Sequence, residues 1–422
     1  MSQQHSSPPT DNPVIVGIDW ADREHEVCIR DAGKTRRQSL LQDPDAIAQW
    51  REQLQKDYGD RSILVAIEQS RGALVHALQD IDGLQIYPVN PKQLARYREA
   101  IYPAGGKNDP RDAELLAMFL QNHQQKLRAW RPENEETRKL AYLSELRRKL
   151  VDERKSLGLR LTAILKLYFP LALALFDKGS TSEFLLDLLK RWPSLEELKR
   201  AHPKALREFF AQHRVRDEDR QTNWFNAIRA ATPLTKNKAL IESHALYVQS
   251  LVRQIAELNR AVTEFDDQLR RCVAQHPDEV LFRAIPGAGD ALIPRLIAAF
   301  GSDRDRYKAA EELQSLSGIA PITQSSGKSS VVIQRIFCPH FLKQTFHEFA
   351  DQARRWSAWS KAFYDLKRSQ GMKHHAAVRA LAFKWIRIMF VLWKTRTIYS
   401  ETQYLQRLRQ KQSPLIPFLT SI

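Results

Sequence analysis

The sequence predicts a mixed α/β domain followed by a mostly helical remainder that contains two long coiled-coil helices. The first observation is that residues 14–125 alternate between strand-like and helix-like patterns. The second is that residues 133–168 and 238–275 repeat apolar side chains at helical spacing, and the third is a run of short helices and turns from residue 280. A chain of 422 residues is too long for one ordinary core, so we expect two or three domains.

The N-terminal pattern predicts three strands in succession, then strands that alternate with helices. One helix should begin at Asp43 and Pro44, because Asp is a good N-cap and Pro fits the first helical turn. This order of elements predicts a mixed sheet covered by helices. The predicted strands are residues 14–21, 26–30, 34–41, 63–68 and 84–89, and the predicted helices are residues 44–58, 71–81, 91–98 and 109–123.

Two long helices are predicted in the centre of the chain, and they should pair either within one chain or across a dimer. The second repeats apolar residues at two heptad positions over about four heptads, which is typical of a coiled-coil seam. Its two sets are Val248, Ile255, Val262 and Leu269, and Leu251, Leu258, Phe265 and Cys272. The first helix carries Leu140, Leu143, Leu146, Leu150, Leu157, Leu161 and Ile164 on one broad face.

These patterns divide the chain into five parts. The segment between the long helices is expected to be helical, with breaks at Pro193, Pro203 and Pro233, and it carries no assigned chemistry. The predicted parts are a disordered tail at residues 1–13, an α/β domain at 14–130, a coiled-coil domain at 131–275 with an insertion at 170–235, a C-terminal domain at 276–400 and a basic tail at 401–422.

The composition favours a polyanionic partner. The net charge is +16 and the isoelectric point is about 9.7, which most often indicates nucleic acid. A basic protein that is merely soluble, or one that lies on acidic lipid, is the alternative. Three scattered cysteines without a CxxC pair argue against disulfides and a zinc site and fit a reducing cytoplasm. No apolar run of membrane-spanning length and no signal peptide is present, so we expect a cytoplasmic protein without a membrane anchor.

Four acidic residues lie where a metal site would need them. Asp19 and Glu68 each end a buried apolar run, and Asp109 and Asp112 lie together where a helix is predicted to start. Converging carboxylates repel one another and need a cation to coexist. Mg²⁺ or Mn²⁺ is the natural cation, and a phosphodiester is the natural substrate of such a metal site. The alternative is that these acids merely end strands and cap helices.

Two further segments could contact a nucleic-acid backbone. The Pro-Gly-x-Gly turn at Gly287 and Gly289 resembles a helix-hairpin-helix, whose backbone N–H groups bind a phosphate, although Pro294 in the following helix departs from that pattern. A plain turn between core helices is the alternative. Residues 351–411 hold 14 Lys and Arg against 3 acids, with aromatic residues interleaved. The candidate binding residues there are Arg354, Arg355, Lys373 and Arg379.

A polar loop at residues 324–330 contains Ser325, Ser326 and Lys328. A loop of this composition is usually a flexible linker, but its lysine and serines would also suit a phosphate.

The motifs together resemble those of a known family. An acid-ended strand, an Ile-Glu-Gln-Ser strand end, a Lys-x-Asp-x-x-Asp-Ala helix start, a Pro-Gly-x-Gly turn and a Ser-Gly-Lys loop occur in this order. This resembles the DEDD insertion-sequence transposases related to the Piv DNA invertase, the bridge-RNA-guided recombinases. The resemblance covers roughly residues 14–400.

The resemblance implies a RuvC-like, ribonuclease-H-like domain whose DEDD acids are Asp19, Glu68, Asp109 and Asp112, with Mg²⁺ or Mn²⁺ as cofactor. A coiled coil would join it to a C-terminal transposase domain. The family's nucleophilic serine precedes the glycine of the Ser-Gly motif, which places it at Ser326. The expected partners are donor and target double-stranded DNA, a noncoding guide RNA and further copies of the chain in a homodimer or homotetramer. Because Ser326 is far from the acids in the sequence, they must meet by folding or across a dimer, and we favour an active site composed from two subunits.

Some departures and alternatives stay open. Asn108 stands where the family commonly has threonine, and Ser325 directly precedes Ser326, so either serine could be the nucleophile. A metal-dependent nuclease of the junction-resolving kind would need only the acids. A nucleic-acid-binding scaffold without catalysis would need neither the acids nor the serine, but the intact acid set argues against such a scaffold.

Overall fold

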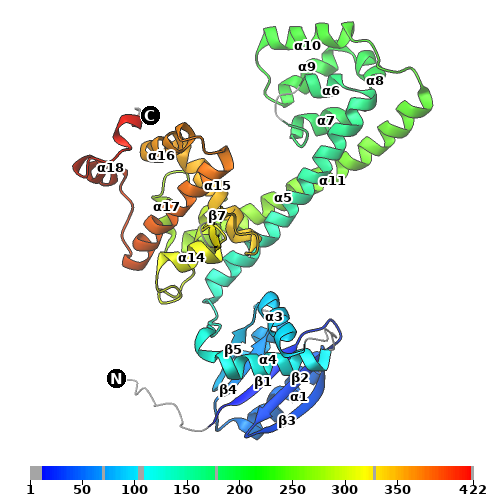
Figure 1. The fold of residues 1–422 in the computed structure, drawn as a ribbon. Helices are drawn as coiled ribbons and strands as arrows, with labels where there is room; N and C mark the ends of the chain where they lie inside the picture. The colour runs from blue at the N-terminus through cyan, green and yellow to red at the C-terminus, as the bar shows by residue number, and fades with distance from the viewer. Residues whose placement is uncertain (1–11, 69–71, 103–108, 176–178, 327–328, 420–422) are drawn as a thin grey trace. The chain divides into compact units, whose positions relative to one another are not determined.

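A computed structural model describes residues 12–68, 72–102, 109–175, 179–326 and 329–419. The chain forms two compact units, Met1–Pro132 and Glu133–Ile422 (Figure 1). The tail expected at residues 1–13 lies almost wholly outside the described residues. Within the described ranges, no helix is long and apolar enough to cross a membrane.

The N-terminal unit is built on a five-stranded mixed sheet. Its strands are β1 (Val14–Asp19), β2 (Glu24–Asp31), β3 (Lys34–Leu41), β4 (Ile63–Ile67) and β5 (Leu84–Pro88), and their order is β3-β2-β1-β4-β5. β1 and β3 run antiparallel to β2, whereas β1, β4 and β5 run parallel to one another. This arrangement confirms the predicted mixed sheet, and it fits a ribonuclease-H-like fold.

Helices cover both faces of this sheet. They are α1 (Pro44–Tyr58), α2 (Ala73–Leu78), α3 (Pro91–Ile101) and α4 (Asp109–His123), with a short 3₁₀ turn, η1 (Gln124–Lys126), after them. Successive residues of a strand face opposite sides. Val16 and Ile18 therefore join a core with α1 and α2, while Ile15 joins a second core with α3 and α4. The central strands are continuous apolar runs because both of their faces are buried.

The second unit contains an antiparallel pair of long helices, α5 (Glu135–Tyr168) and α11 (Lys238–Gln275). Arg147 donates to Asp266 across the pair at 2.5 Å, and Arg154 donates to Asn259 at 3.1 Å. The residue numbers rise along one helix as they fall along the other, so the two helices form a hairpin within one chain. The supercoiling of this pair stays a prediction.

The first of the two predicted heptad sets of α11 is buried, whereas Leu258, Phe265 and Cys272 of the second set are only partly buried. Every residue of the first heptad set, from Val248 to Leu269, is buried. Leu146 of α5, which was predicted to lie on one broad apolar face, is 46% exposed, so that face is not buried along its whole length. The reason is that the buried residues Leu140 and Ser144, four residues apart, share one side of the helix, and Leu146 lies on the other side.

Five short helices fold between the two long ones, as expected for a helical insertion. They are α6 (Leu171–Ala174), α7 (Glu183–Arg191), α8 (Leu195–Arg200), α9 (Pro203–Gln212) and α10 (Glu218–Ala230). Figure 1 shows them gathered at one end of the α5–α11 hairpin. They share a core with α5 and α11 that includes Phe209, Phe210 and Leu251. The predicted breaks are confirmed, since Pro193 follows α7 and Pro203 starts α9.

The remainder of this unit is mostly helical. Its elements are α12 (Glu279–Arg283), α13 (Ile293–Phe300), α14 (Ala310–Leu316), β6 (Ile322–Ser326), β7 (Ser329–Ile333), α15 (His340–Trp356), α16 (Ala358–Ser369), α17 (His374–Thr395), α18 (Glu401–Gln410) and η2 (Ile416–Phe418). The basic tail expected from residue 401 thus contains a helix. Trp359, Trp385 and Trp393 are fully buried, so most of the interleaved aromatics form the core, although Trp356 is 69% exposed.

The polar loop predicted at residues 324–330 is not a plain linker. Its described residues belong to an antiparallel hairpin, in which Ser326 of β6 pairs with Ser329 of β7. Strand pairing overrides the weak strand propensity of serine and glutamine here.

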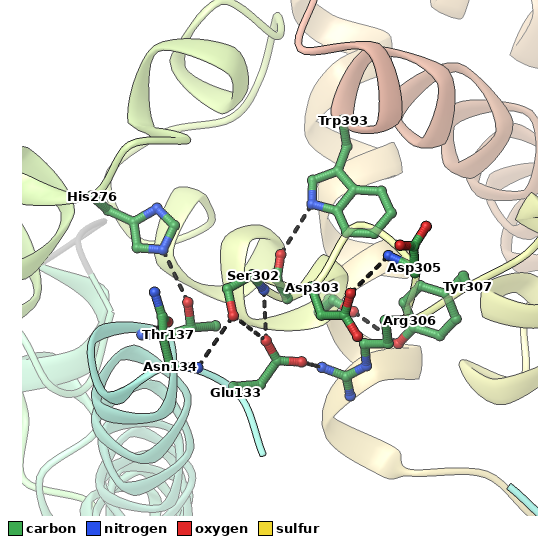
Figure 2. Close-up of polar contacts among 12 residues, drawn as sticks. Glu133, Asn134, Thr137, His276, Ser302, Asp303, Asp305, Arg306, Tyr307 and Trp393 are labelled. Atoms are coloured by element: carbon green, nitrogen blue, oxygen red, sulfur yellow. Dashed lines mark hydrogen bonds and ion pairs between the residues drawn. The ribbon is translucent and has the colours of Figure 1, made fainter. Parts of the chain in front are cut away.

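A polar cluster fixes the start of α5 within the second unit (Figure 2). Glu133 accepts hydrogen bonds from the backbone N–H and the hydroxyl of Ser302, at 2.6 and 2.7 Å, and it pairs with Arg306. One turn into α5, the Thr137 hydroxyl is 3.0 Å from Nε2 of His276, the residue that follows α11. The beginning of α5, the end of α11 and the loop after α13 are therefore held together.

Candidate functional site

Asp19 and Glu68 lie side by side at the ends of two parallel strands. Asp19 is the last residue of β1, and Glu68 follows the last residue of β4. The register pairs Ile18 with Ile67, so the two acids occupy matching positions at one edge of the sheet. Strand ends of this kind hold carboxylates rigidly beside the edge where ligands bind in such sheets.

Gly17 allows α4 to approach β1 closely. A Cβ atom on Gly17 would lie 2.6 Å from the backbone nitrogen of Ala117 and even closer to the carbonyl oxygen of Ala113. Only a residue without a side chain fits at such a distance. This close packing brings the first turn of α4, with Asp109 and Asp112, to the end of β1.

A second contact holds α4 in place. Glu114 accepts a hydrogen bond from Arg37 of β3 at 2.6 Å and lies 3.9 Å from Arg30 of β2. Nearby, burial and then the charge of Glu114 raise the pKa of the Cys28 thiol to about 11. Cys28 does not belong to the group of metal-ligating side chains that converge within the described residues.

Three of the four predicted acids converge. Three carboxylate oxygens, one from each of Asp19, Asp109 and Asp112, all lie within 4.8 Å of one another. Glu68 is not part of this cluster. Oxygen ligands of this kind suit Mg²⁺ or Mn²⁺, and a cation would offset their mutual repulsion. The donor set therefore fits the divalent metal that the sequence predicts.

Arg98 of α3 was not among the predicted site residues. Its Nε and Nη2 donate to the two oxygens of Asp112 at 2.8 and 2.7 Å, and the Asp112 side chain is almost fully buried. Such a two-point contact fixes the orientation of a carboxylate. Each oxygen keeps a second lone pair, so Asp112 can accept from Arg98 and still bind a metal. No sequence spacing signals this contact.

Comparison with known families now decides the identity. Residues 16–170 match a family model described as a transposase, the DEDD transposase of IS110 elements. Residues 280–365 match the model of the transposase IS116/IS110/IS902 family. The chain is a transposase of the IS110/IS116/IS902 family. It is therefore an enzyme of DNA cleavage and rejoining.

Individual relatives resemble the transposase over most of its length. It is 28% identical to the protein named as the mini-circle transposase for IS117 of Streptomyces coelicolor, over 92% of this chain and 95% of that protein. It is 23% identical to the 42 kDa protein of insertion element IS900 from Mycobacterium paratuberculosis, over 92% and 97% of the two chains. The likeness therefore includes both units of the transposase.

The β6–β7 hairpin of the transposase separates the two candidate serines. Ser326 pairs with Ser329 and Ser325 pairs with Ser330. Neighbouring residues of a strand point to opposite faces, so the side chains of Ser325 and Ser326 cannot be presented on the same face of the hairpin. Both serines are exposed. The expected phosphate ligand Lys328 lies outside the described residues.

The Pro-Gly-x-Gly turn has a packing role in the transposase. Gly287 has a positive φ of 85°, and a Cβ atom there would lie 2.7 Å from the backbone nitrogen of Ala353 in α15. Glycine is therefore required for the turn and for close approach to α15. Gly289 is exposed and has open space around it. Pro294 does not disturb α13, because it lies in the first helical turn.

The four predicted basic residues have different surroundings. Arg354 and Arg355 both donate to Asp351, at 2.7 and 3.3 Å, so their charge is partly matched. Lys373 is exposed at the start of α17. Arg379 is half-buried in α17 and makes no hydrogen bond or ion pair with any residue that the structure describes.

Proposed function

We propose that this transposase cuts DNA with divalent metal ions held by Asp19, Glu68, Asp109 and Asp112. The observation that supports the proposal most directly is the convergence of three of these carboxylates within 4.8 Å. Their position at strand ends and at a helix start suits ligands that must be held rigidly. When bound, Mg²⁺ or Mn²⁺ would stabilise the charge that develops on the attacked phosphodiester.

The proposed nucleophile is the hydroxyl of Ser326. Its oxygen attacks the scissile phosphorus, so that an Oγ–P bond forms while the bond from phosphorus to the 3′ oxygen breaks. The serine proton passes to a base, and the departing 3′ oxygen takes up a proton to become a free 3′-OH. Rejoining reverses these steps with a 3′-OH from another strand. The resulting strand exchange proceeds through a Holliday junction. A serine hydroxyl is a weak nucleophile, so the base that removes its proton is needed to activate it.

The acids and Ser326 belong to different units of the chain, so the reaction requires both units at one phosphate. We assign the complete site to units from two copies in a homodimer or homotetramer. Donor and target DNA are the substrates, and base pairing with a noncoding guide RNA of the element supplies the sequence specificity. The net charge of +16 supports contacts with both nucleic acids.

Trapping of a covalent protein–DNA adduct tests the serine chemistry. The assay contains DNA that flanks the element, its candidate RNA and Mg²⁺, with the wild type, Ser326→Ala and Asp19→Ala. Ser325→Ala is the matched control, because its side chain belongs to the opposite face of the hairpin. We expect an adduct in the wild type and in Ser325→Ala, and none in the other two variants. An adduct that persists in Ser326→Ala and disappears in Ser325→Ala would reassign the nucleophile.

A metal-dependent nuclease of the junction-resolving kind is the second candidate function. The acid cluster favours it, because metal-dependent strand cleavage requires the carboxylates and no serine. In that case Ser326→Ala would still cleave DNA, Asp19→Ala would not, and no adduct would form with any variant. This result would reject the covalent mechanism.

A further inference from the structure

A group of basic side chains gathers between α15 and α17 in the second unit. His347 and Asp351 are four residues apart on α15, and His375 and Arg379 are four residues apart on α17, so each pair shares one helix face. The ring centroids of His347 and His375 are 5.3 Å apart, and those of His374 and His375 are 4.8 Å apart. Three imidazoles and a guanidinium group are therefore close neighbours.

The negative charge at this group is already shared among other cations. Asp351 is the acid that faces His347, but it accepts hydrogen bonds from Arg354 and Arg355 on its own helix. It is also 3.9 Å from Nε2 of His374, whose Nδ1 is 2.8 Å from the hydroxyl of Tyr364. Asp351 therefore has little negative charge left to balance His375 and Arg379 of α17.

Arg379 and His347 are the side chains of this group without a polar partner among the described residues. Both are half-buried, and the described part of the chain provides neither with a hydrogen bond or an ion pair. Burial lowers the pKa of Arg379. Burial also lowers the pKa of His347, and the charges of His375 and Arg379 act in the same direction. An anion bound from outside would offset the cost of burying the Arg379 charge and would favour the protonated form of His347.

We propose that His347, His375 and Arg379 form a binding site for a phosphodiester group of a nucleic acid. A guanidinium group and protonated imidazoles are donors only, and phosphate oxygens are acceptors, so the two sets are complementary. His375 is exposed, which leaves the group open to a ligand. The choice of a nucleic acid as the ligand rests on the proposed function. The arrangement of the three basic side chains does not depend on that function.

Phosphate binding at this site is linked to protonation. A bound phosphate favours the protonated form of the His347 imidazole, whose pKa burial lowers, so we expect the affinity to increase as the pH falls and His347 becomes protonated. The charged groups that face the histidines from both helices are Asp351, His374 and Arg379.

The test is binding of a short duplex DNA and a short RNA hairpin, both of unrelated sequence, to the full chain. Fluorescence anisotropy across salt concentration and pH compares the wild type, Arg379→Gln and the double variant His347→Gln/His375→Gln. Lys361→Gln is the matched control, because Lys361 lies on α16 and is already paired with Asp365. We expect Arg379→Gln to reduce the slope of log affinity against log salt by about 1. The double variant should lose most of the affinity gained at low pH, and the control should match the wild type.

The outcomes separate this site from the proposed chemistry. An effect with DNA alone or RNA alone identifies the polymer whose phosphate is bound. Unchanged salt slopes and pH profiles with both polymers would overturn the site, provided that thermal melting shows folded variants. The adduct assay is independent of this result, so a missing phosphoserine with altered salt slopes would reject the serine chemistry and keep the phosphate site.

Discussion

Arg98 binds both oxygens of Asp112, the most buried acid of the candidate metal site. The guanidinium group balances a carboxylate that would otherwise be buried beside Asp19 and Asp109. It also fixes the direction of the carboxylate without any need for a bound metal. Arg98 is therefore a positioning residue for the proposed metal ligand.

Substitution of Arg98 should destabilise the metal-free protein. In Arg98→Gln, Asp112 stays buried without a cationic partner, so we expect the free energy of unfolding to fall by about 3 kcal/mol. Thermal melting with and without Mn²⁺ measures this effect. Mn²⁺ should raise the melting temperature more in the variant than in the wild type, because the ion replaces the missing positive charge. Arg96→Gln, an exposed arginine on the same helix, is the control. Equal melting temperatures for the metal-free wild type and Arg98→Gln would contradict this role.

Substitution of Gly17 should displace α4. In Gly17→Ala, the new methyl group would overlap the backbone of Ala113 and Ala117, and we expect a loss of about 2 kcal/mol in stability. The displaced helix would also move Asp109 and Asp112, so the affinity for Mn²⁺ measured by calorimetry should fall. Gly33→Ala is the control, since its Cβ meets no atom within 4 Å. The control should lose only about 1 kcal/mol through its positive φ and should keep its metal affinity. Normal metal affinity in a folded Gly17→Ala would refute this account.

Acid should weaken the joint between α5 and α11. Burial lowers the pKa of His276. Its Nδ1 accepts the N–H of Asp278 at 3.1 Å, so the neutral ring carries its proton on Nε2 and donates to Thr137. A protonated ring could not accept that bond.

The sign of the pH effect follows from linkage. The folded pKa of His276 lies below the unfolded value of about 6.5, so the unfolded chain binds more protons. This stabilisation is present above about pH 6.5 and is lost as pH falls toward the folded pKa. The melting temperature should decrease with acidification, and less steeply in His276→Gln, whose amide can make both bonds. The exposed His340→Gln should melt like the wild type at every pH. Identical pH profiles for His276→Gln and the wild type would exclude this linkage.

The acid site was largely predictable from sequence. Asp19 follows an apolar run, and parallel strands place their carboxyl ends at one edge, so its location near Glu68 followed from the pattern. Asp109 and Asp112 are three residues apart at a helix start, which puts both on one face. The absence of Glu68 from the close cluster depends on side-chain directions that a pattern does not contain.

Other features depend on tertiary contacts. The approach of α3 to α4 pairs Arg98 with Asp112, although nothing in the spacing of these residues distinguishes this arginine from others. The polar composition of the serine segment is typical of a flexible linker, yet pairing of Gln324 with Val331 and of Ser325 with Ser330 makes it part of a strand. Leu146 fits a helical repeat but lies on the side of α5 away from the buried residues Leu140 and Ser144.

Glu133 is the first residue after the acid-bearing unit, and both of its carboxylate oxygens are bonded within the helical unit. Because Glu133 is held by these contacts, few backbone bonds of the linker before it are free to rotate. Any reorientation of the acids during a reaction cycle must therefore be absorbed by the short stretch of backbone upstream of Glu133. Pro132 narrows that freedom further, since its ring removes one of the backbone rotations. Lengthening the connection immediately before Pro132 would thus extend the range of positions open to the proposed metal ligands, with every residue of the candidate site unchanged.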